Sequence, residues 1–271
     1  MRPSASPDRD TAVLRSVDKM NTMSFHIFPF DTVTSTNDVV MSDTARYGHG
    51  SIVTARQQTA GRGQRGNRWV TAPGENLLFS LVLEPTHIRV EEQFLISEMA
   101  ALAASDAIRA VSGGSVPCRI KWPNDLYVGD RKIGGILIEH ALHSEFLSRS
   151  VLGIGINVAQ REFDPALPNP TSLAREMTTD KVPLPAPEQV LEAFCTAFPF
   201  RYGQPAGELH ADFMARLWRG DGEPHRYRDA ASGEVFEALI ADVEPLTGEM
   251  TLRLPNGTER RYWFKEVEAL F

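Results

Sequence analysis

Residues 118–140, with the sequence CRIKWPNDLYVGDRKIGGILIEH, decide much of the fold. Short apolar runs alternate here with turn-forming residues, and Gly129 with Asp130 has the composition of a tight hairpin turn. A pattern of this kind predicts consecutive strands of one sheet. The strands are expected over 118–122, 125–128, 131–140 and, after a short gap, 148–159.

The sequence before and after this region predicts the rest of a mixed α and β structure. Good helix formers with apolar residues at helical spacing predict a helix over 90–111, and helix-capping residues predict another over 37–47. Residues 188–218 resume a helical pattern, which Pro199 and Pro205 are expected to interrupt. Further strands are expected over 25–30, 51–57 and 76–85.

The sequence after Trp218 consists of closely spaced short strands separated by Ser-Gly, Thr-Gly and Asn-Gly turns. This spacing is typical of a small β-barrel, which has to close its own edges. We therefore divide the chain into a loose Ser- and Pro-rich tail (1–24), a main domain (25–219) and a small C-terminal β-barrel (220–271).

Composition narrows the function class and the compartment. The 271 residues include 28 Lys and Arg against 35 Asp and Glu, a formal net charge of −7, which argues against a general nucleic-acid coat. No apolar stretch approaches the ~20 residues of a membrane span, and the polar N-terminus lacks the apolar core of a signal peptide. Only two cysteines are present. We predict a cytoplasmic protein that does not cross a membrane.

A loop rich in glycine and arginine follows the strand at 51–57. Its residues 61–66, GRGQRG, match the dinucleotide-binding pattern G-x-G-x-x-G, but that pattern has to open a helix, whereas Pro73 and Gly74 lead into another strand here. Glycines admit close approach of an anion, and guanidinium groups bind carboxylate or phosphate in a forked geometry. The loop therefore binds an anionic ligand or is a solvated turn with incidental charge. Its candidate ligand-binding residues are Arg62, Arg65, Arg68 and Trp69.

Three other clusters allow a ligand-binding and a structural interpretation. Lys121 precedes a Trp-Pro-Asn-Asp turn and is either a phosphate ligand or a solvated surface residue. Glycine pairs inside the apolar strands 134–140 and 152–158 indicate close approach of a ligand or tight strand packing. The Ser-Thr-Asn sequence at 35–37 is explained by helix capping, and it also offers polar groups to a ligand.

Taken in order, these motifs resemble biotin protein ligase, the enzyme that attaches biotin to lysines of carrier proteins. The matching strings are TSTND, RQQTAGRGQRGNRW, NLLFSLVL, KWPNDLYV, KIGGILIE and GIGIN, and the resemblance covers about residues 25–220. It implies an α+β fold with a catalytic domain related to class II aminoacyl-tRNA synthetases and lipoate ligases, in which helices flank a mixed sheet. The C-terminal β-barrel fits the small second domain of that family.

The resemblance also implies a reaction in two steps. The biotin carboxylate attacks the α-phosphorus of ATP, normally with Mg²⁺, and forms biotinyl-5′-AMP and pyrophosphate. A lysine of a biotin carboxyl carrier protein or domain then attacks the mixed anhydride and releases AMP. Because two anions meet in the first step, cationic side chains have to neutralise them and the growing charge on the phosphoryl oxygens.

The site residues follow from matching positions in the family. Arg62 is assigned to the biotin carboxylate and adenylate phosphate, and Lys121 to the α-phosphate and bridging oxygen. The expected biotin-site residues are Ser35, Thr36, Asn37, Gln58, Gly61, Arg62, Gly63, Gln64, Lys121 and Gly135. The expected ATP- and adenylate-binding residues are Arg62, Arg65, Trp69, Lys121 and Asn157. The metal ligands cannot be read from the sequence.

One position departs from the family pattern, because many relatives carry Arg where this chain has Gln64. A neutral amide cannot hold an adenylate by charge, and we hypothesise that Arg65 or Arg68 compensates for the missing guanidinium.

Two other functions stay open: a lipoate or octanoate ligase on the same scaffold, and a non-catalytic regulator that binds biotin. The phosphate site built from Arg62 and Lys121 argues against the regulator, since storage of biotin needs no such site. About 24 residues precede the first expected strand, which is too short for a winged helix-turn-helix, so DNA binding is not expected. The sequence does not give the oligomeric state, and a homodimer is compatible with it.

Overall fold

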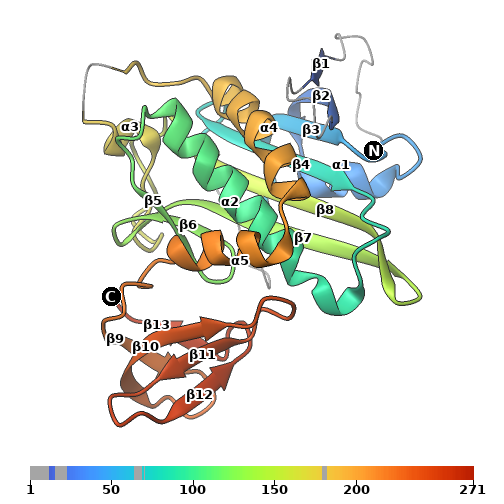
Figure 1. The fold of residues 1–271 in the computed structure, drawn as a ribbon. Coiled ribbons are helices and arrows are strands. Elements are labelled where there is room, and N and C mark those ends of the chain that lie inside the picture. The colour runs from blue at the N-terminus through green and yellow to red at the C-terminus, as the bar shows by residue number, and fades with distance from the viewer. Residues whose placement is uncertain (1–11, 16–22, 64–68, 70, 179–181) are drawn as a thin grey trace.

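The structure is a computed structural model that describes residues 12–15, 23–63, 69, 71–178 and 182–271. An eight-stranded mixed sheet carries helices on its faces, and a five-stranded antiparallel sheet lies beside it at the C-terminal end (Figure 1). The strands of the large sheet are β1 (Ala12–Arg15), β2 (Ser24–Val33), β3 (Ser51–Gln58), β4 (Asn76–Leu83), β5 (Cys118–Lys121), β6 (Asp125–Val128), β7 (Arg131–His143) and β8 (Phe146–Asn157).

The large sheet has the order β1-β2-β3-β4-β8-β7-β6-β5. Only β2 and β3 pair in parallel among these strands of the described residues; every other pairing is antiparallel. The strands expected from the sequence are confirmed, and β1 adds one more inside the segment that we expected to be a loose tail. That expectation is wrong for residues 12–15, because the open edge of β2 offers unpaired backbone groups to them.

Both faces of the large sheet are covered. Ile52 and Val53 are neighbours on β3, yet they belong to different hydrophobic clusters, because successive strand side chains point to opposite faces. Val151 and Leu152 on β8 divide in the same way. The cluster of Ile52 and Leu152 includes the helices α2 (Phe94–Val111), α4 (Pro187–Gly203) and α5 (Ala206–Ala215), whereas Val40 of α1 (Thr36–Ser42) joins the cluster of Val53 and Val151.

Two helix boundaries differ from the sequence expectation. Helix α1 ends at Ser42 rather than at residue 47, because the Oδ1 atom of Asp43 accepts a hydrogen bond from the backbone N–H of Arg46 and forms a local turn instead. Helix α2 begins at Phe94, after a separate 3-10 turn over Val90–Glu92. In the long connection after β8 the structure also contains the short helix α3 (Leu173–Glu176).

Pro199 lies inside α4, so our expectation that it interrupts the helix is wrong. A proline removes one backbone hydrogen bond from a helix, but here the flanking Phe194 and Phe198 are fully buried and stack on each other. Tertiary packing of this kind outweighs the local cost. Pro205 does separate α4 from α5, where it stands at the N-cap.

The C-terminal strands are β9 (His225–Asp229), β10 (Val235–Val243), β11 (Met250–Arg253), β12 (Glu259–Tyr262) and β13 (Val267–Ala269), in the order β12-β11-β10-β9-β13. The first half of β10 pairs with β9 and the second half with β11. A bulge at Ala241 separates the β11 pairings of Ile240 and Asp242, and bulges increase the bend of a strand. None of the described helices has the length and apolar character that crossing a membrane requires.

The large body and the C-terminal sheet contact each other near the start of α2. The indole Nε1 of Trp122 donates a hydrogen bond to the carbonyl of Gly248 at 2.9 Å. Close to this contact, Glu98 of α2 is fully buried with its Oε1 atom 2.7 Å from Nδ1 of His210 on α5, while its Oε2 atom has no hydrogen-bond partner among the described residues. Burial raises the pKa of Glu98 to about 8 and lowers the pKa of His210, so burial favours the neutral form of both groups.

We expect the protein to lose stability as the pH rises toward 8. The unfolded chain releases the Glu98 proton near pH 4.5 and the folded chain near pH 8, so the folded state binds more protons in this interval and the free energy of unfolding falls with rising pH. The lowered pKa of His210 opposes this trend below pH 6.5, which leaves the decline steepest between pH 6.5 and about 8.

The variant Glu98→Gln keeps a donor for His210 and removes the titration. Its free energy of unfolding should exceed that of the parent at pH 8.5 by about 1–3 kcal/mol. Thermal and urea unfolding followed by circular dichroism between pH 5 and 8.5 measures this difference. Parallel pH profiles for the two proteins would contradict the buried neutral pair.

Candidate functional site

One cavity of about 480 Å³ collects most of the site residues expected from the sequence. It is lined by strands of the large sheet, by the start of α1 and by residues of the C-terminal sheet such as Ile240 and Met250. Both cationic groups that we assigned to the two anions, Arg62 and Lys121, line this same cavity. The expected residues that line it are Ser35, Thr36, Asn37, Gln58, Arg62, Gly63, Trp69, Lys121 and Gly135.

Antiparallel register explains how Lys121 reaches the cavity. Lys121 pairs with Asp125, Asp125 with Gly135, and Gly135 with Gly155, so the four residues form one row across β5, β6, β7 and β8. Residues directly opposite each other on neighbouring strands share a face of the sheet. The row therefore places an ammonium group and a carboxylate beside two positions that carry no side chain.

Gly153 and Gly155 of β8 are required by close approach of other side chains. A Cβ atom at Gly155 would lie 2.5 Å from Cε2 of Trp69, and one at Gly153 would overlap Oδ1 of Asn37. Together with Gly135, these two residues form what we call the glycine floor of the cavity. The sequence predicts a ligand or tight strand packing at the glycine pairs; strand packing is found at Gly134, which meets the carbonyl of Gly155, whereas the groups that approach Gly153 and Gly155 are the side chains of Asn37 and Trp69.

The substitution Gly153→Ala is expected to lower the free energy of unfolding by about 1–3 kcal/mol, because the added methyl group has to displace the buried Asn37 carboxamide. Gly207→Ala is the matched control: Gly207 lies in α5 with no atom within 4 Å of an added Cβ, so alanine should stabilise the helix by about 0.5–1 kcal/mol. Urea unfolding of both variants measures the two effects. Equal changes in the free energy of unfolding would show that the Asn37 side chain does not require a glycine at position 153.

A buried polar corner forms where α1 begins. The backbone N–H of Thr36 donates to Oε1 of Gln58 at 2.7 Å, and the hydroxyl of Ser80 on β4 lies 2.7 Å from Oγ1 of Thr36 and 2.6 Å from Oδ1 of Asn37. Ser35 stands at the N-cap of α1 and is buried, but its side chain makes no capping hydrogen bond. Helix capping therefore does not explain Ser35, contrary to the structural interpretation of the sequence.

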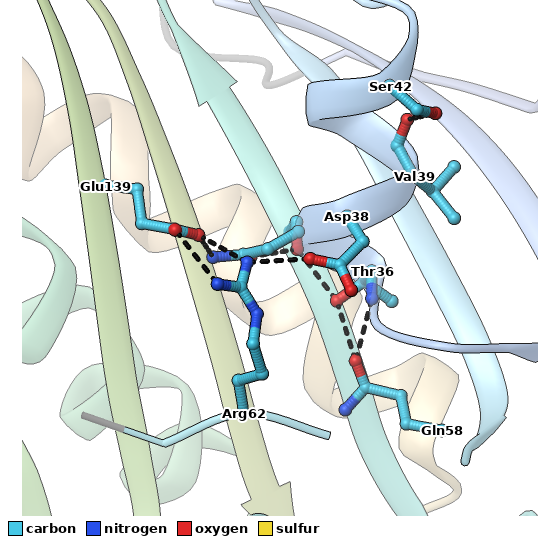
Figure 2. Close-up of polar contacts among 9 residues, drawn as sticks. Thr36, Asp38, Val39, Ser42, Gln58, Arg62 and Glu139 are labelled. Atoms are coloured by element: carbon cyan, nitrogen blue, oxygen red, sulfur yellow. Dashed lines mark hydrogen bonds and ion pairs between the residues drawn. The ribbon is translucent and has the colours of Figure 1, made fainter. Parts of the chain in front are cut away.

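Arg62 is held between two carboxylates (Figure 2). Its Nη2 atom lies 2.8 Å from Oδ1 of Asp38 and 2.9 Å from Oε2 of Glu139, and its Nη1 atom donates to Oε1 of Glu139 at 3.2 Å. Glu139 comes from β7 and also accepts a hydrogen bond from Nδ2 of Asn37 at 2.7 Å. The guanidinium is thus oriented by α1 and β7 together, and it faces the polar corner.

Two of the three lysines that line the cavity in the described part of the chain, Lys121 and Lys132, have ammonium groups with different surroundings. Nζ of Lys121 donates to the hydroxyl of Tyr127 at 3.3 Å and lies about 5 Å from the ring centroids of Tyr127, Trp218 and Phe271. Burial lowers the pKa of Lys121, and the nearby Lys132 adds to this effect. Nζ of Lys132 forms an ion pair with Asp125 at 2.7 Å and lies 5.8 Å from the centroid of the Trp69 ring.

Comparison with known proteins identifies the family. The model of the biotin/lipoate A/B protein ligase family matches residues 28–157. The biotin ligase of acetyl-CoA carboxylase from Paracoccus denitrificans is 34% identical over 217 residues, which cover 76% of this chain and 85% of that relative. The chain belongs to the biotin/lipoate A/B protein ligase family.

Two further proteins match this chain at lower sequence identity and over different shares of their own length. The bifunctional ligase/repressor BirA of Escherichia coli is 32% identical over 141 residues, and the chain spans 42% of its length. The biotin protein ligase of Aquifex aeolicus, solved with biotin and ATP, superposes with a TM-score of 0.69 at 22% identity, covering 90% of this chain and 98% of that chain. The structural match confirms the predicted α+β fold, with a mixed sheet flanked by helices.

Two residues that the family resemblance assigned to the site do not line this cavity. The carboxamide of Asn157 donates to the carbonyl of Thr171 at 2.9 Å, and Asn157 does not line the cavity. Gly61 also does not line it; the carbonyl of Gly61 accepts a hydrogen bond from the backbone N–H of Trp69. Gln64, Arg65 and Arg68 fall outside the described residues.

Sequence reasoning missed four residues of the site: Ser80, Asp125, Lys132 and Glu139. Ser80 could have been found from the sequence, because it is a serine among the apolar residues of its strand, which is buried on both faces. Lys132 could also have been found, because it is a charged residue close before Gly134 and Gly135 in the sequence. Asp125 and Glu139 gave no such signal, because an acidic residue at a strand end is usually solvated.

Proposed function

We propose that this chain is a biotin protein ligase, which uses ATP to convert biotin to biotinyl-5′-AMP and then transfers the biotinyl group to a lysine of a biotin carboxyl carrier protein. The observation that carries the proposal is the convergence of Arg62, Lys121 and Lys132 on one cavity. Two anionic substrates have to meet before the first bond forms, and these three cationic side chains, with Lys265 as a fourth in the lining, provide the necessary charge.

The buried polar corner suits the ureido ring of biotin. This ring has two N–H donors and a carbonyl acceptor, and burying them without partners is costly. Ser35, Thr36 and Gln58 offer hydroxyl and amide groups at this end of the cavity. With the ring held there, the valeryl tail passes the Asn37 and Trp69 side chains that cover Gly153 and Gly155, and its carboxylate reaches the space between Arg62 and Lys132.

The other end of the cavity suits ATP. Trp69 offers a flat indole for stacking with adenine, and its buried Nε1 atom has no hydrogen-bond partner among the described residues. The family resemblance assigned Lys121 to the α-phosphate and bridging oxygen. Because Lys132 lies 5.8 Å from the centroid of the Trp69 ring, whereas Lys121 lies beside Trp218 and Phe271, we replace that assignment and propose Lys132 for the α-phosphate and Lys121 for the distal phosphates. Mg²⁺ enters with the nucleotide as part of the substrate.

In the first step the biotin carboxylate oxygen forms a bond to the α-phosphorus, and the bond from that phosphorus to the bridging oxygen breaks, releasing pyrophosphate. The cationic groups stabilise the negative charge that grows on the phosphoryl oxygens. In the second step the lysine amine of the carrier attacks the carbonyl carbon of the anhydride and AMP leaves. We place this reaction in the cytoplasm, where Cys118 and Cys195 stay reduced.

The test is an ATP–pyrophosphate exchange assay with biotin and, separately, with lipoate. Exchange with biotin, followed by transfer to a purified carrier domain, supports the proposal. Exchange with lipoate alone would make the chain a lipoate ligase of the same family. Biotin binding without exchange would make it a non-catalytic regulator.

The lowered pKa of Lys121 gives the reaction a pH signature. Because the uncomplexed protein loses this ammonium charge at a lower pH than an ordinary lysine, we expect kcat/KM for ATP to fall on the alkaline side before pH 10.5. The variant Lys121→Arg keeps its charge and should move this fall to higher pH. Identical alkaline profiles for the parent and Lys121→Arg would remove Lys121 from the nucleotide site.

A further inference from the structure

The surroundings of Arg62 conflict with a simple anion site. In this structure one guanidinium faces the carboxylates of both Asp38 and Glu139, so among the described residues this corner has an excess of one negative charge (Figure 2). A carboxylate substrate that approaches Arg62 is repelled by that excess. The binding of a second anion to Arg62 is therefore favoured when one of the two acids moves away.

The hydrogen bonds of Arg62 distinguish the two acids. Nη1 donates to Oε1 of Glu139 at 3.2 Å and Nη2 donates to Oε2 of Glu139 at 2.9 Å, whereas Asp38 contacts Nη2 as an ion pair at 2.8 Å. A guanidinium has five N–H donors, and two of them are used in the hydrogen bonds to Glu139. An incoming carboxylate therefore competes with Asp38, rather than with Glu139, for the Nη2 side of the guanidinium.

The two acids are not held equally. Glu139 binds Arg62 through both oxygens, accepts a further hydrogen bond from Asn37, and has a side chain that is 31% exposed. Asp38 contacts Arg62 through one oxygen, and its side chain is 44% exposed. A bidentate arginine–carboxylate pair is stronger than a single ion pair between exposed side chains. Asp38 is therefore the partner that leaves first.

We propose that Asp38 is an exchangeable counterion, which the carboxylate of the ligand replaces on Arg62, and that Glu139 is a positioning residue, which keeps the guanidinium aimed at the cavity during the exchange. This inference rests on the proposed function, since it takes biotin as the ligand. It makes the site selective for a ligand with a charged tail, because a neutral tail cannot replace Asp38.

The experiment compares biotin with its neutral amide, biotinamide, by isothermal titration calorimetry. Asp38→Asn and Glu139→Gln each remove one negative charge from the same corner. If repulsion alone mattered, both variants would bind biotin more tightly. We expect opposite signs: Asp38→Asn should tighten biotin binding about two- to fivefold, the contribution of an exposed ion pair, and Glu139→Gln should weaken it about five- to tenfold through loss of the bidentate pair.

Biotinamide binding should stay within about twofold in both variants, which also shows that the cavity is intact. Asp43→Asn is the matched control: it removes the same charge just after α1, where the side-chain oxygen serves a local turn, and it should change neither ligand. Tighter biotin binding by both site variants overturns the positioning role of Glu139. Unchanged binding by Asp38→Asn overturns the exchange, and equal shifts for biotin and biotinamide overturn the charge selectivity.

These outcomes are separate from a failure of the proposed function. If the parent protein binds biotin but the variants behave otherwise than expected, this inference alone is wrong. If the parent binds neither biotin nor biotinamide, the proposed function is wrong and the inference fails with it.

Discussion

Arg62→Ala should reduce biotin-dependent ATP–pyrophosphate exchange by about 100-fold or more, the usual effect of removing one preorganised donor from a site of developing charge. The variant removes the guanidinium that pairs with Asp38 and Glu139. The corner then carries two uncompensated negative charges, which repel the biotin carboxylate as well as the phosphates. We therefore expect both a higher KM for biotin and a lower kcat.

Arg131→Ala is the matched control for this prediction. Arg131 is exposed, pairs with the largely buried Glu176 and does not line the cavity, so its loss should change exchange by less than about threefold. Arg62→Lys keeps the charge but cannot form the fork with Glu139, and it should recover only part of the activity. Full exchange activity in Arg62→Ala would exclude the guanidinium from the first step.

Lys132→Met should lower kcat/KM for exchange by about 100-fold, because the Nζ atom of Lys132 lies 5.8 Å from the centroid of the Trp69 ring and 3.3 Å from the position of a Cβ atom added at Gly135. Its ion pair with Asp125 holds the ammonium group over the row of strand residues that ends at Gly155. Methionine keeps a similar length and removes the charge, so the loss reports charge rather than packing.

Lys121→Met is the informative comparison for Lys132→Met. Lys121 lies among three aromatic rings toward the C-terminal sheet, and we expect its loss to raise the KM for ATP about tenfold while kcat falls less. Steady-state exchange rates at varied ATP and biotin concentrations separate the two lysines. If Lys121→Met lowers kcat more than Lys132→Met, the roles of the two ammonium groups are reversed.

The strands could be predicted from the sequence because their signals are local. Alternating apolar residues and Gly-Asp or Asn-Gly turns set the strands within a few residues, and the motif KWPND with its following glycines indicated a site. The end of α1 could not be predicted, since the turn that ends it depends on one side-chain oxygen of Asp43. Pro199 was misjudged because its helix is stabilised by distant packing.

The sequence by itself determined the order of strands and helices, the glycine-arginine loop and the choice of Arg62 and Lys121 as cations of the site. Only the tertiary structure decided that Lys132 joins them, that Asn157 binds Thr171 rather than lining the cavity, and that Arg62 is shared by two acids. The physical reason is that charge and hydrogen bonding depend on distances across strands. Asp38 and Glu139 are about a hundred residues apart in the chain, and antiparallel pairing together with the packing of α1 brings both to one guanidinium.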